Sequence, residues 1–380
     1  MVVTPIRTRL ESEFETIGFD SILFRRSWIE RRLSETEPNT AEDVTKTFVS
    51  PLGCGVLVSD FKSFRGEFVK AFSFQASEFK IHLPFLFVPS SVLIGMVGLP
   101  KTIAFVDRLL HQIEKRISAV HASFVTLPVL LDPTVRVGGL LSPSKDESAK
   151  DYLVHLQNPM PYLTAYSFRG SKIGQDFTGR MVMDSFESSK TRAWDRLTDA
   201  ELEVFVHGDE CNPLVCTADL MCFYINFKLY QRATYDERKL DYKNVAEVLS
   251  EFPFLSTIYR FDQETKEAFV HYNYKPIEYM EKVKHPVTFL MYDKPQGQSL
   301  TLRDVVSKRL WYCAAKKAYS TEGCFKRFNW DSDAKYVDDG DTIVCVGSES
   351  MRVAQTLKMA ANVKIQTGLQ FRDEIEKTGI

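Results

Sequence analysis

The residue types in this chain that are best suited to bind a metal ion lie together in its middle. A histidine and three cysteines follow the pattern His207-x3-Cys211-x4-Cys216-x5-Cys222, with Asp209 and Glu210 inside it. A helix beginning at Pro213 would place Cys216 and Cys222 on different faces, where they could not converge on one ion. Because cysteine is among the most buried residue types, we interpret the cysteines as core residues and expect no bound metal and no cofactor.

A set of carboxylates near the C-terminal end suggests a second kind of chemistry. The segment 336–339, Tyr-Val-Asp-Asp, resembles the Tyr-x-Asp-Asp turn of reverse transcriptases, and the segment 295–297, Pro-Gln-Gly, resembles the part of those enzymes that supports the template base. Asp262 ends a predicted strand further upstream. The resemblance implies a polymerase-palm-like C-terminal region in which Asp262, Asp338 and Asp339 hold two magnesium ions for phosphoryl transfer.

The surroundings of this turn differ from those in reverse transcriptases. In that family apolar strand residues flank the two aspartates, whereas charged residues such as Asp331 and Lys335 precede them here. Gly340 follows them, and glycine readily adopts the backbone angles of a tight turn. A simple hairpin turn therefore explains the same residues, and a metal-dependent nucleotidyltransferase is kept as the alternative function.

A third feature is a stretch at 307–330 in which basic and aromatic residues are interleaved. Cations that neutralise phosphates, together with rings that stack on bases, are what contact with a single-stranded nucleic acid requires. A solvated helix face whose rings turn into the core is the other interpretation of the same pattern. The predicted nucleic-acid contact consists of Lys308, Arg309, Tyr312, Lys316, Lys317, Lys326 and Arg327.

The elements that must position these residues indicate an α+β fold with two mixed domains. We expect short strands packed with amphipathic helices, and a C-terminal β-hairpin–α–β unit over residues 334–367. The N-terminal domain is predicted at 1–138 and the C-terminal domain at 150–380. A linker rich in glycine, proline and serine is predicted at 132–150.

Within these domains, individual elements follow from apolar periodicity and end signals. Leu10, Phe14 and Ile17 form one stripe that predicts a helical start, and a second helix is expected to follow. Short apolar runs between 55 and 99 predict strands. The other predicted helices are 102–120, 199–206, 213–231, 241–252 and 301–318, and the later predicted strands include 256–261 and 287–292.

Composition limits the function classes. A net charge of −2 argues against a general polyanion binder and confines any RNA contact to a local patch. The 28 Phe, 15 Tyr and 4 Trp provide for large cores or contact surfaces. Seven irregularly spaced cysteines are typical of a reducing compartment. We expect no secretion signal, because charges interrupt the N-terminal residues, and no membrane association.

These observations favour a non-enzymatic structural or assembly protein over an enzyme. We expect it to form oligomers with itself or to bind other protein subunits, and to contact RNA locally. A viral shell, capsid-clamp or nucleoprotein-like component, located in the cytoplasm or within a virion, fits this description. Such a function needs no catalytic residues, whereas the alternative nucleotidyltransferase uses Asp262, Asp338 and Asp339.

Overall fold

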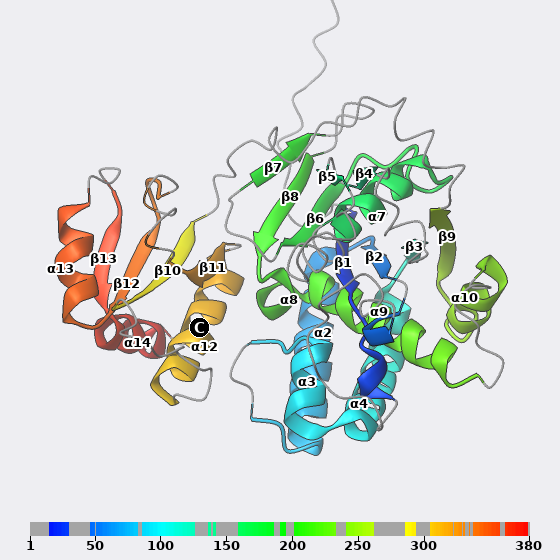
Figure 1. Cartoon of the computed structure of the whole chain (residues 1–380), viewed down its shortest axis with the longest axis horizontal. Coiled ribbons are helices and arrows are strands. Elements are labelled where there is room, and N and C mark those ends of the chain that lie inside the picture. The colour runs from blue at the N-terminus through cyan, green and yellow to red at the C-terminus, as the bar shows by residue number, and fades with distance from the viewer. Residues whose placement is uncertain are drawn as a thin grey trace, which may run out of the picture.

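A computed structural model describes most of the chain in a series of segments. The described residues are 15–29, 46–49, 51–82, 86–125, 136–137, 140–141, 159–185, 191–194, 201–232, 241–261, 286–293, 305–321, 323–328, 330, 334, 337–357 and 362–378. Helices and strands are mixed along the described chain, as the α+β prediction requires. Figure 1 shows two sheets that lie beside each other, each with its own helices.

Among the described residues, a larger sheet contains seven strands in the order β7–β8–β6–β1–β2–β3–β9. The strands are β1 (Thr16–Ile22), β2 (Leu52–Val58), β3 (Ala119–Val125), β6 (Arg180–Ser185), β7 (Thr191–Trp194), β8 (Glu201–Val206) and β9 (Leu255–Phe261). β1, β2 and β3 form an antiparallel meander. β6 is parallel to β1, and β8 is parallel to β6, so three neighbouring strands run in one direction at the centre of the sheet.

Helices cover both faces of the larger sheet. α7 (Pro159–Gly170) packs on one face, and α9 (Pro213–Tyr230) packs on the other with support from α2 and α4. Gly18 in β1 permits the close approach of α9, because a Cβ atom at this position would lie 2.6 Å from Leu214 Cβ. The remaining elements around this sheet are η1 (Arg26–Trp28), α2 (Phe61–Glu78), α3 (Ser90–Val97), α4 (Leu99–Ile113), η2 (Glu114–Arg116), the β4 (Arg136–Val137) and β5 (Leu140–Leu141) pair, α8 (Gly208–Cys211) and α10 (Tyr242–Leu249).

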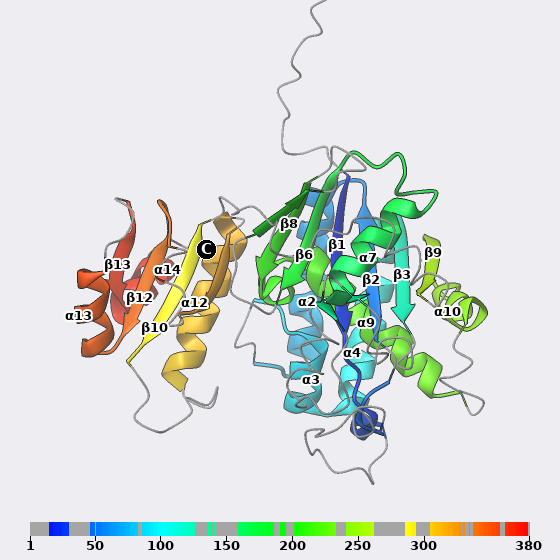
Figure 2. The same cartoon turned by 45° about the horizontal axis from the view of Figure 1, so that its top comes forward.

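The residues from 287 to 377 contain the smaller sheet, and we call them the C-terminal unit. Its strands run parallel in the order β11–β10–β12–β13 within the described residues. Its elements are β10 (Val287–Tyr292), α12 (Val305–Thr321), β11 (Cys324–Arg327), β12 (Thr342–Val346), α13 (Ser348–Thr356), β13 (Lys364–Thr367) and α14 (Gly368–Lys377). α12 and β11 lie next to α8 and β8, so the unit packs at the end of the larger sheet (Figure 2).

The larger sheet shows that the chain does not divide into two units at the predicted linker. Strands from both sides of 132–150 join this one sheet, because β1 pairs with β6 and β3 pairs with β9. The two sheets divide instead between β9 and β10. The predicted β–α–β tail is present as β12–α13–β13. The hairpin strand predicted before it does not pair with β12, because β10 and β13 occupy both sides of β12.

Several predicted elements are of the wrong type. The predicted helical start contains the strand β1, and the predicted helix 199–206 contains β8, which pairs with β6 and β7. Two runs predicted as strands lie in helices α2 and α3. Helix α4 ends at Ile113, and β3 begins within the predicted helix 102–120. Helix α9, β9 and β10 agree closely with prediction. No helix of the described residues is both long enough and apolar enough to span a bilayer.

Candidate metal centre

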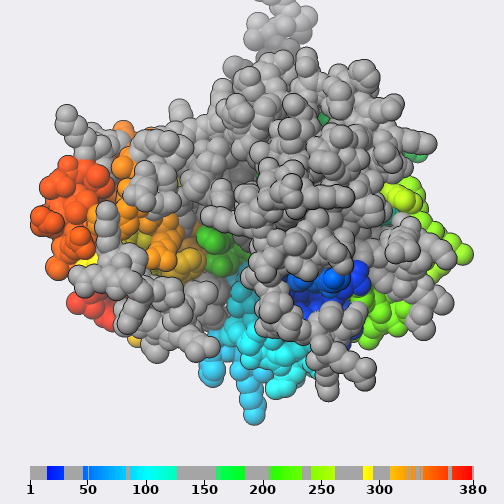
Figure 3. Space-filling view, in the orientation of Figure 1, coloured from blue at the N-terminus to red at the C-terminus, as the bar shows by residue number. Residues whose placement is uncertain are grey.

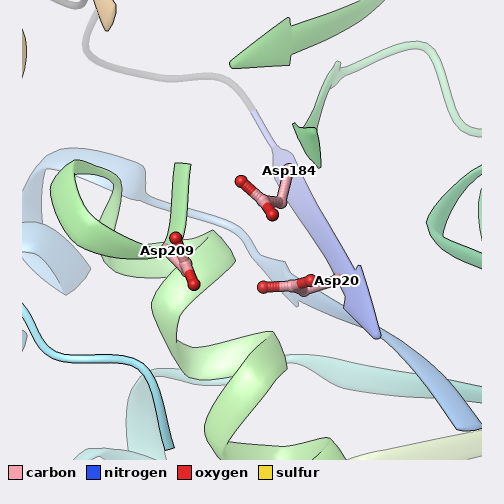
Figure 4. A group of neighbouring side chains, drawn as sticks. All are labelled: Asp20, Asp184 and Asp209. Atoms are coloured by element: carbon pink, nitrogen blue, oxygen red, sulfur yellow. The ribbon is translucent and has the colours of Figure 1, made fainter. Parts of the chain in front are cut away.

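Three aspartates from distant parts of the sequence meet at one point beside the larger sheet. Asp20 lies in β1, Asp184 lies in β6 and Asp209 lies in α8. One carboxylate oxygen from each lies within 4.8 Å of the others. Figure 4 shows the three side chains pointing toward one another from two strands and a helix. The sequence separates them by as much as 189 residues, from Asp20 to Asp209.

Strand register and a turn bring the three aspartates together. Phe19 pairs with Met183 in the parallel β1–β6 ladder, so the next residues, Asp20 and Asp184, lie side by side on the same face. β8 is the parallel neighbour of β6 and leads directly into α8. The amide of Gly208, the first residue of α8, donates a hydrogen bond to Asp184 Oδ1 at 2.6 Å. This bond fixes the start of α8 beside β6 and places Asp209 next to the two strand aspartates.

The three carboxyl groups are almost completely removed from water. Relative exposures are 2% for Asp20, 3% for Asp184 and 9% for Asp209. Burial raises the pKa of Asp20 well above its usual value, and the neighbouring charge of Asp184 raises it further. The same two causes, burial first and then Asp184, raise the pKa of Asp209. Negative groups this close in a buried site repel one another unless protons or a cation neutralise them.

A fourth acid extends this cluster. Glu210 is 7% exposed, and among the described residues its Oε2 atom has no hydrogen-bond partner. Burial raises the pKa of Glu210, and the charge of Asp184 raises it further. A buried carboxylate oxygen without a donor is costly. Glu210 Oε1 lies 3.9 Å from His207 Nδ1, so Oε2 is the oxygen whose burial a cation would offset.

Asp219, also buried nearby, is different because it has donors. The Ser90 amide donates to Asp219 Oδ2 at 2.6 Å, and the Ser90 hydroxyl donates to Oδ1 at 3.0 Å. Burial raises the pKa of Asp219 to about 6, while the two Ser90 hydrogen bonds lower it. We therefore assign Asp219 to the support of helix α9 and not to the candidate centre.

The donor set of the candidate centre suits a hard divalent cation. Oxygen-only carboxylate ligands favour Mg²⁺, Mn²⁺ or Ca²⁺ over zinc or copper. Metal–oxygen bonds of about 2.1–2.6 Å allow two ligands on opposite sides of one ion to lie about 4–5 Å apart. The observed limit of 4.8 Å for Asp20, Asp184 and Asp209 lies within that range. The residues present therefore fit one divalent ion held by Asp20, Asp184 and Asp209.

A small groove lies between the larger sheet and the C-terminal unit. Two arginines line it, Arg65 from α2 and Arg180 from β6, together with Phe205, Asn212 and Tyr319. The Arg65 guanidinium lies over the Tyr319 ring at 3.9 Å and donates to the Tyr319 carbonyl at 3.1 Å. Phe205 pairs with Asp184 in the β6–β8 ladder, so one lining residue neighbours the candidate centre, although the acids themselves do not line the groove. In Figure 3, green atoms from the middle of the chain are visible between the cyan helices and the orange C-terminal unit.

The histidine and cysteines considered first do not converge. Cys211, Cys216 and Cys222 are buried in the hydrophobic clusters of the two units, as the core interpretation expects. The Cys222 thiol donates to the backbone carbonyl of Asp20 at 3.6 Å. Only Asp209 and Glu210 of that segment point to metal chemistry, and their partners are aspartates that the sequence analysis did not select.

The structure describes only some of the residues that resemble a polymerase palm. Asp262 lies outside the described residues, so its distance to the turn aspartates stays untested. Asp338 and Asp339 lie in a turn before β12: the Asp338 amide donates to Asp341 Oδ2 at 2.9 Å, and Asp339 Oδ1 accepts from the Asn362 amide at 3.3 Å. Their described contacts are those of a turn.

The predicted nucleic-acid contact lies on α12 and β11 of the C-terminal unit. Lys316 Nζ lies 5.2 Å from the centre of the Tyr312 ring. Lys317 Nζ donates to Thr342 Oγ1 at 2.6 Å, and burial lowers its pKa, so this side chain turns inward. Arg309 Nε donates to Glu376 at 3.1 Å.

The other three residues of this contact are less fully described. The Arg327 guanidinium lies over the Tyr292 ring at 5.6 Å. The side chains of Lys308 and Lys326 lie outside the described part. Binding of nucleic acid by these seven residues stays a prediction.

The aspartates were missed because no local motif marks them. Asp20 and Asp184 each end an apolar run, in the sequences Gly-Phe-Asp and Val-Met-Asp. Acidic residues at the ends of neighbouring parallel strands meet at one edge, but that signal requires the strand order. The first of these strands was predicted as a helix, so the signal was lost.

Comparisons with known proteins assign the chain to a family but do not indicate a function. The family model described as domain of unknown function DUF8203 matches residues 40–286, which is more than half of the chain, so the protein belongs to this family. An uncharacterized protein of Archaeoglobus fulgidus is 22% identical over 228 residues. That match covers 59% of this chain and 64% of the relative, so the chain spans less than two thirds of the relative's length. No solved structure matches the chain.

Proposed function

We propose that the protein is an enzyme that uses divalent metal ions to cleave phosphodiester bonds in nucleic acid. The observation that carries the proposal is the meeting of Asp20, Asp184 and Asp209 in a buried site. Glu210 supports it, because its buried Oε2 atom has no donor among the described residues. Without a cation, protons have to relieve the repulsion among the clustered acids, as the raised pKa values of Asp20, Asp209 and Glu210 indicate.

The ligand chemistry selects the reaction class. Carboxylate sites with a hard cation are typical of phosphoryl-transfer enzymes, in which the cation polarises the phosphate and lowers the pKa of an attacking water. In this chain, Asp20, Asp184 and Asp209 would hold the cation in a site from which the surrounding side chains exclude most bulk water. A buried, preorganised site strengthens the interaction with charge that develops on the phosphate.

Basic groups in the groove favour a polymeric phosphate substrate. Arg65 and Arg180 line the groove together with Phe205, the strand neighbour of Asp184, and Tyr319 provides a ring in the same groove. Contacts with phosphates position a nucleic acid, and stacking on rings adds binding that does not depend on sequence. The predicted contact residues on α12, such as Lys316, lie on the helix that forms one side of this groove.

This proposal shares metal-dependent phosphoryl transfer with the alternative from sequence but uses other residues. The nucleotidyltransferase alternative uses Asp262, Asp338 and Asp339. The non-enzymatic assembly function, with RNA contact in a cytoplasmic particle or virion, also stays a prediction. Native mass spectrometry of the purified protein tests it, because an assembly protein gives a large complex and a lone monomer contradicts that prediction.

A nuclease assay tests the proposed function. Labelled single-stranded and double-stranded DNA and RNA are incubated with the protein in Mg²⁺, in Mn²⁺ and in EDTA. We expect cleavage that needs the metal and is lost in Asp184→Asn. Asp339→Asn is the matched control, and we expect it to cleave like the wild type. Loss of cleavage in Asp339→Asn with full activity in Asp184→Asn would favour the palm-like alternative instead.

A further inference from the structure

We infer that the C-terminal unit holds Asp209 in its ligand position by packing aromatic side chains against the ring of His207. The inference rests on the proposed role of Asp209 as a metal ligand. It assigns a positioning function to His207, Trp311 and Phe325. Of these, His207 also lies beside the acids, because its Nδ1 atom is 3.9 Å from Glu210 Oε1. Three observations carry it: the backbone of His207, the contacts of its ring, and the extent of the family match.

The backbone of His207 is in the left-handed region, with φ 52° and ψ 44°. Residues with a Cβ atom adopt this conformation at a cost, so the surrounding contacts must maintain it. His207 lies between the end of β8 and the start of α8, where the chain turns toward the carboxylates. The next residue donates its amide to Asp184 Oδ1 at 2.6 Å, and the one after it is Asp209. The left-handed turn therefore sets the positions of two of the three aspartates.

The ring of His207 is held by aromatic side chains of the C-terminal unit. It stacks on Phe325 of β11 with a centroid distance of 5.8 Å and an interplanar angle of 28°. Trp311 of α12 contacts it edge-on at 5.7 Å and 70°. Trp311 and Phe325 also pack against each other at 5.5 Å. The Trp311 indole donates to the Tyr292 hydroxyl at 3.2 Å, which fixes its orientation.

The family match covers part of the candidate centre and neither of the aromatic residues that contact the His207 ring; Asp20 lies before its first residue. Asp184, His207 and Asp209 lie within the matched residues 40–286. Trp311 and Phe325 lie beyond residue 286, in the C-terminal unit. The C-terminal unit thus contacts the matched region at the turn that leads from β8 to Asp209, in addition to the Arg65–Tyr319 contact described above. Displacement of the unit would release the His207 ring and, through it, the ligand.

Metal affinity measured by calorimetry tests the inference with Mn²⁺ as the probe. Phe325→Leu removes the stacked ring but keeps an apolar side chain. Phe371→Leu is the matched control, because Phe371 is buried in the same hydrophobic cluster as Phe325, but the described ring contacts of His207 are with Phe325 and Trp311. We expect Phe325→Leu to weaken Mn²⁺ binding about threefold to tenfold, the scale of one lost aromatic pair, and Phe371→Leu to change it less than twofold.

A second variant keeps the test decisive if Phe325→Leu fails to fold. His207→Asn tolerates the left-handed backbone but has no ring, and we expect a similar loss of affinity. In a double-mutant cycle, the two changes together should weaken binding less than the product of their single effects, because both remove the His207–Phe325 contact. Equal affinity in Phe325→Leu and Phe371→Leu, or losses that simply multiply, would overturn the inference. A wild-type protein that binds no Mn²⁺ would contradict the proposed function itself, and the inference with it.

Discussion

The two sheets bury aspartates in opposite ways. In the smaller sheet, Asp341 is fully buried, and its carboxylate accepts the amides of Val287 at 2.8 Å and Asp338 at 2.9 Å. Asp293 accepts the Ser350 amide at 2.6 Å. In the larger sheet, Asp20 accepts the Ser21 amide and Asp184 the Gly208 amide, each at 2.6 Å, and Asp209 accepts the Glu210 amide. The difference is that these three carboxylates face one another.

The pKa values follow this difference. Burial raises the pKa of Asp293, but hydrogen bonds from the amides at the start of α13 outweigh burial, so the pKa is lowered overall. Burial and mutual repulsion instead raise the pKa of Asp20 and of Asp209. A buried carboxylate needs donors, a proton or a cation. The smaller sheet supplies donors, and the larger sheet supplies an arrangement that a divalent cation would complete.

The largest expected effect comes from replacing one aspartate in each sheet with asparagine, in two separate variants. We expect Asp184→Asn to reduce phosphodiester cleavage at least about 10²–10³-fold, the scale of losing one preorganised electrostatic contact. Asp341→Asn should keep the activity of each folded molecule, because its contacts are with backbone amides of the smaller sheet. The measurement is the cleavage rate at saturating Mg²⁺, corrected for the folded fraction. Equal losses of cleavage rate in both variants would contradict the proposed difference between the two sheets.

In the absence of metal, a replacement in the smaller sheet should lower the free energy of unfolding more than a replacement in the larger sheet. We expect Asp341→Asn to lower the free energy of unfolding by about 1–3 kcal/mol, because charge-assisted hydrogen bonds to a buried carboxylate are lost. Asp20→Asn should raise that free energy in EDTA, because it removes one repelling charge. Urea unfolding at neutral pH measures both changes. A strong loss of stability in Asp20→Asn would mean that the cluster is structural.

The direction of the pH dependence follows from the raised pKa values. Folded Asp20 and Asp209 hold protons at pH values where the unfolded groups, near pKa 3.8, have lost them. Without metal, their contribution to stability therefore falls as pH rises above about 4. Asp20→Asn should reduce this fall.

His121 should give the opposite slope. Its ring is buried between Thr257 and Ser167, at 2.6 Å and 2.8 Å, and burial lowers its pKa to about 3. The unfolded histidine binds a proton near pH 6.5, so stability is lost as pH falls below that value. We expect His121 to contribute a loss of about 2 kcal/mol between pH 7 and pH 4.5. Urea unfolding of the wild type and of His121→Gln at both values measures it, and equal slopes would contradict the assignment.

The smallest expected effects come from one helix cap in each region. Asn212 accepts the Leu214 amide at 2.9 Å at the start of α9, and Thr367 accepts the Gln370 amide at 3.2 Å at the start of α14. Replacing either with alanine should lower the free energy of unfolding by about 1 kcal/mol. Only Asn212→Ala should also weaken Mn²⁺ binding, because α9 follows directly after α8. Thermal unfolding and Mn²⁺ titration separate the two effects.

The sequence allowed those elements to be predicted whose signals are local. Asn212 and Pro213 mark the start of α9, and the apolar runs of β9 and β10 end at clear breaks. Helix α2 was missed although Phe64, Phe68 and Phe72 recur every four residues, because short apolar runs were interpreted as alternating. β8 was missed because its pairing with β6 and β7 decides its conformation.

The candidate centre could not be predicted in the same way. Asp209 and Glu210 were noted beside a histidine and cysteines, but their partners lie in β1 and β6, far away in sequence. Only the parallel pairing of these strands brings Asp20 and Asp184 together. A site built from strand register leaves no spacing signal along the chain.

The most direct test of the central claim is a Mn²⁺ titration of the wild type and of Asp184→Asn by calorimetry at neutral pH. If Asp20, Asp184 and Asp209 form a cation site, the wild type binds at least one Mn²⁺ per chain, and the variant binds it at least about tenfold more weakly. A wild type that binds no Mn²⁺, or a variant that binds it equally well, would contradict the claim.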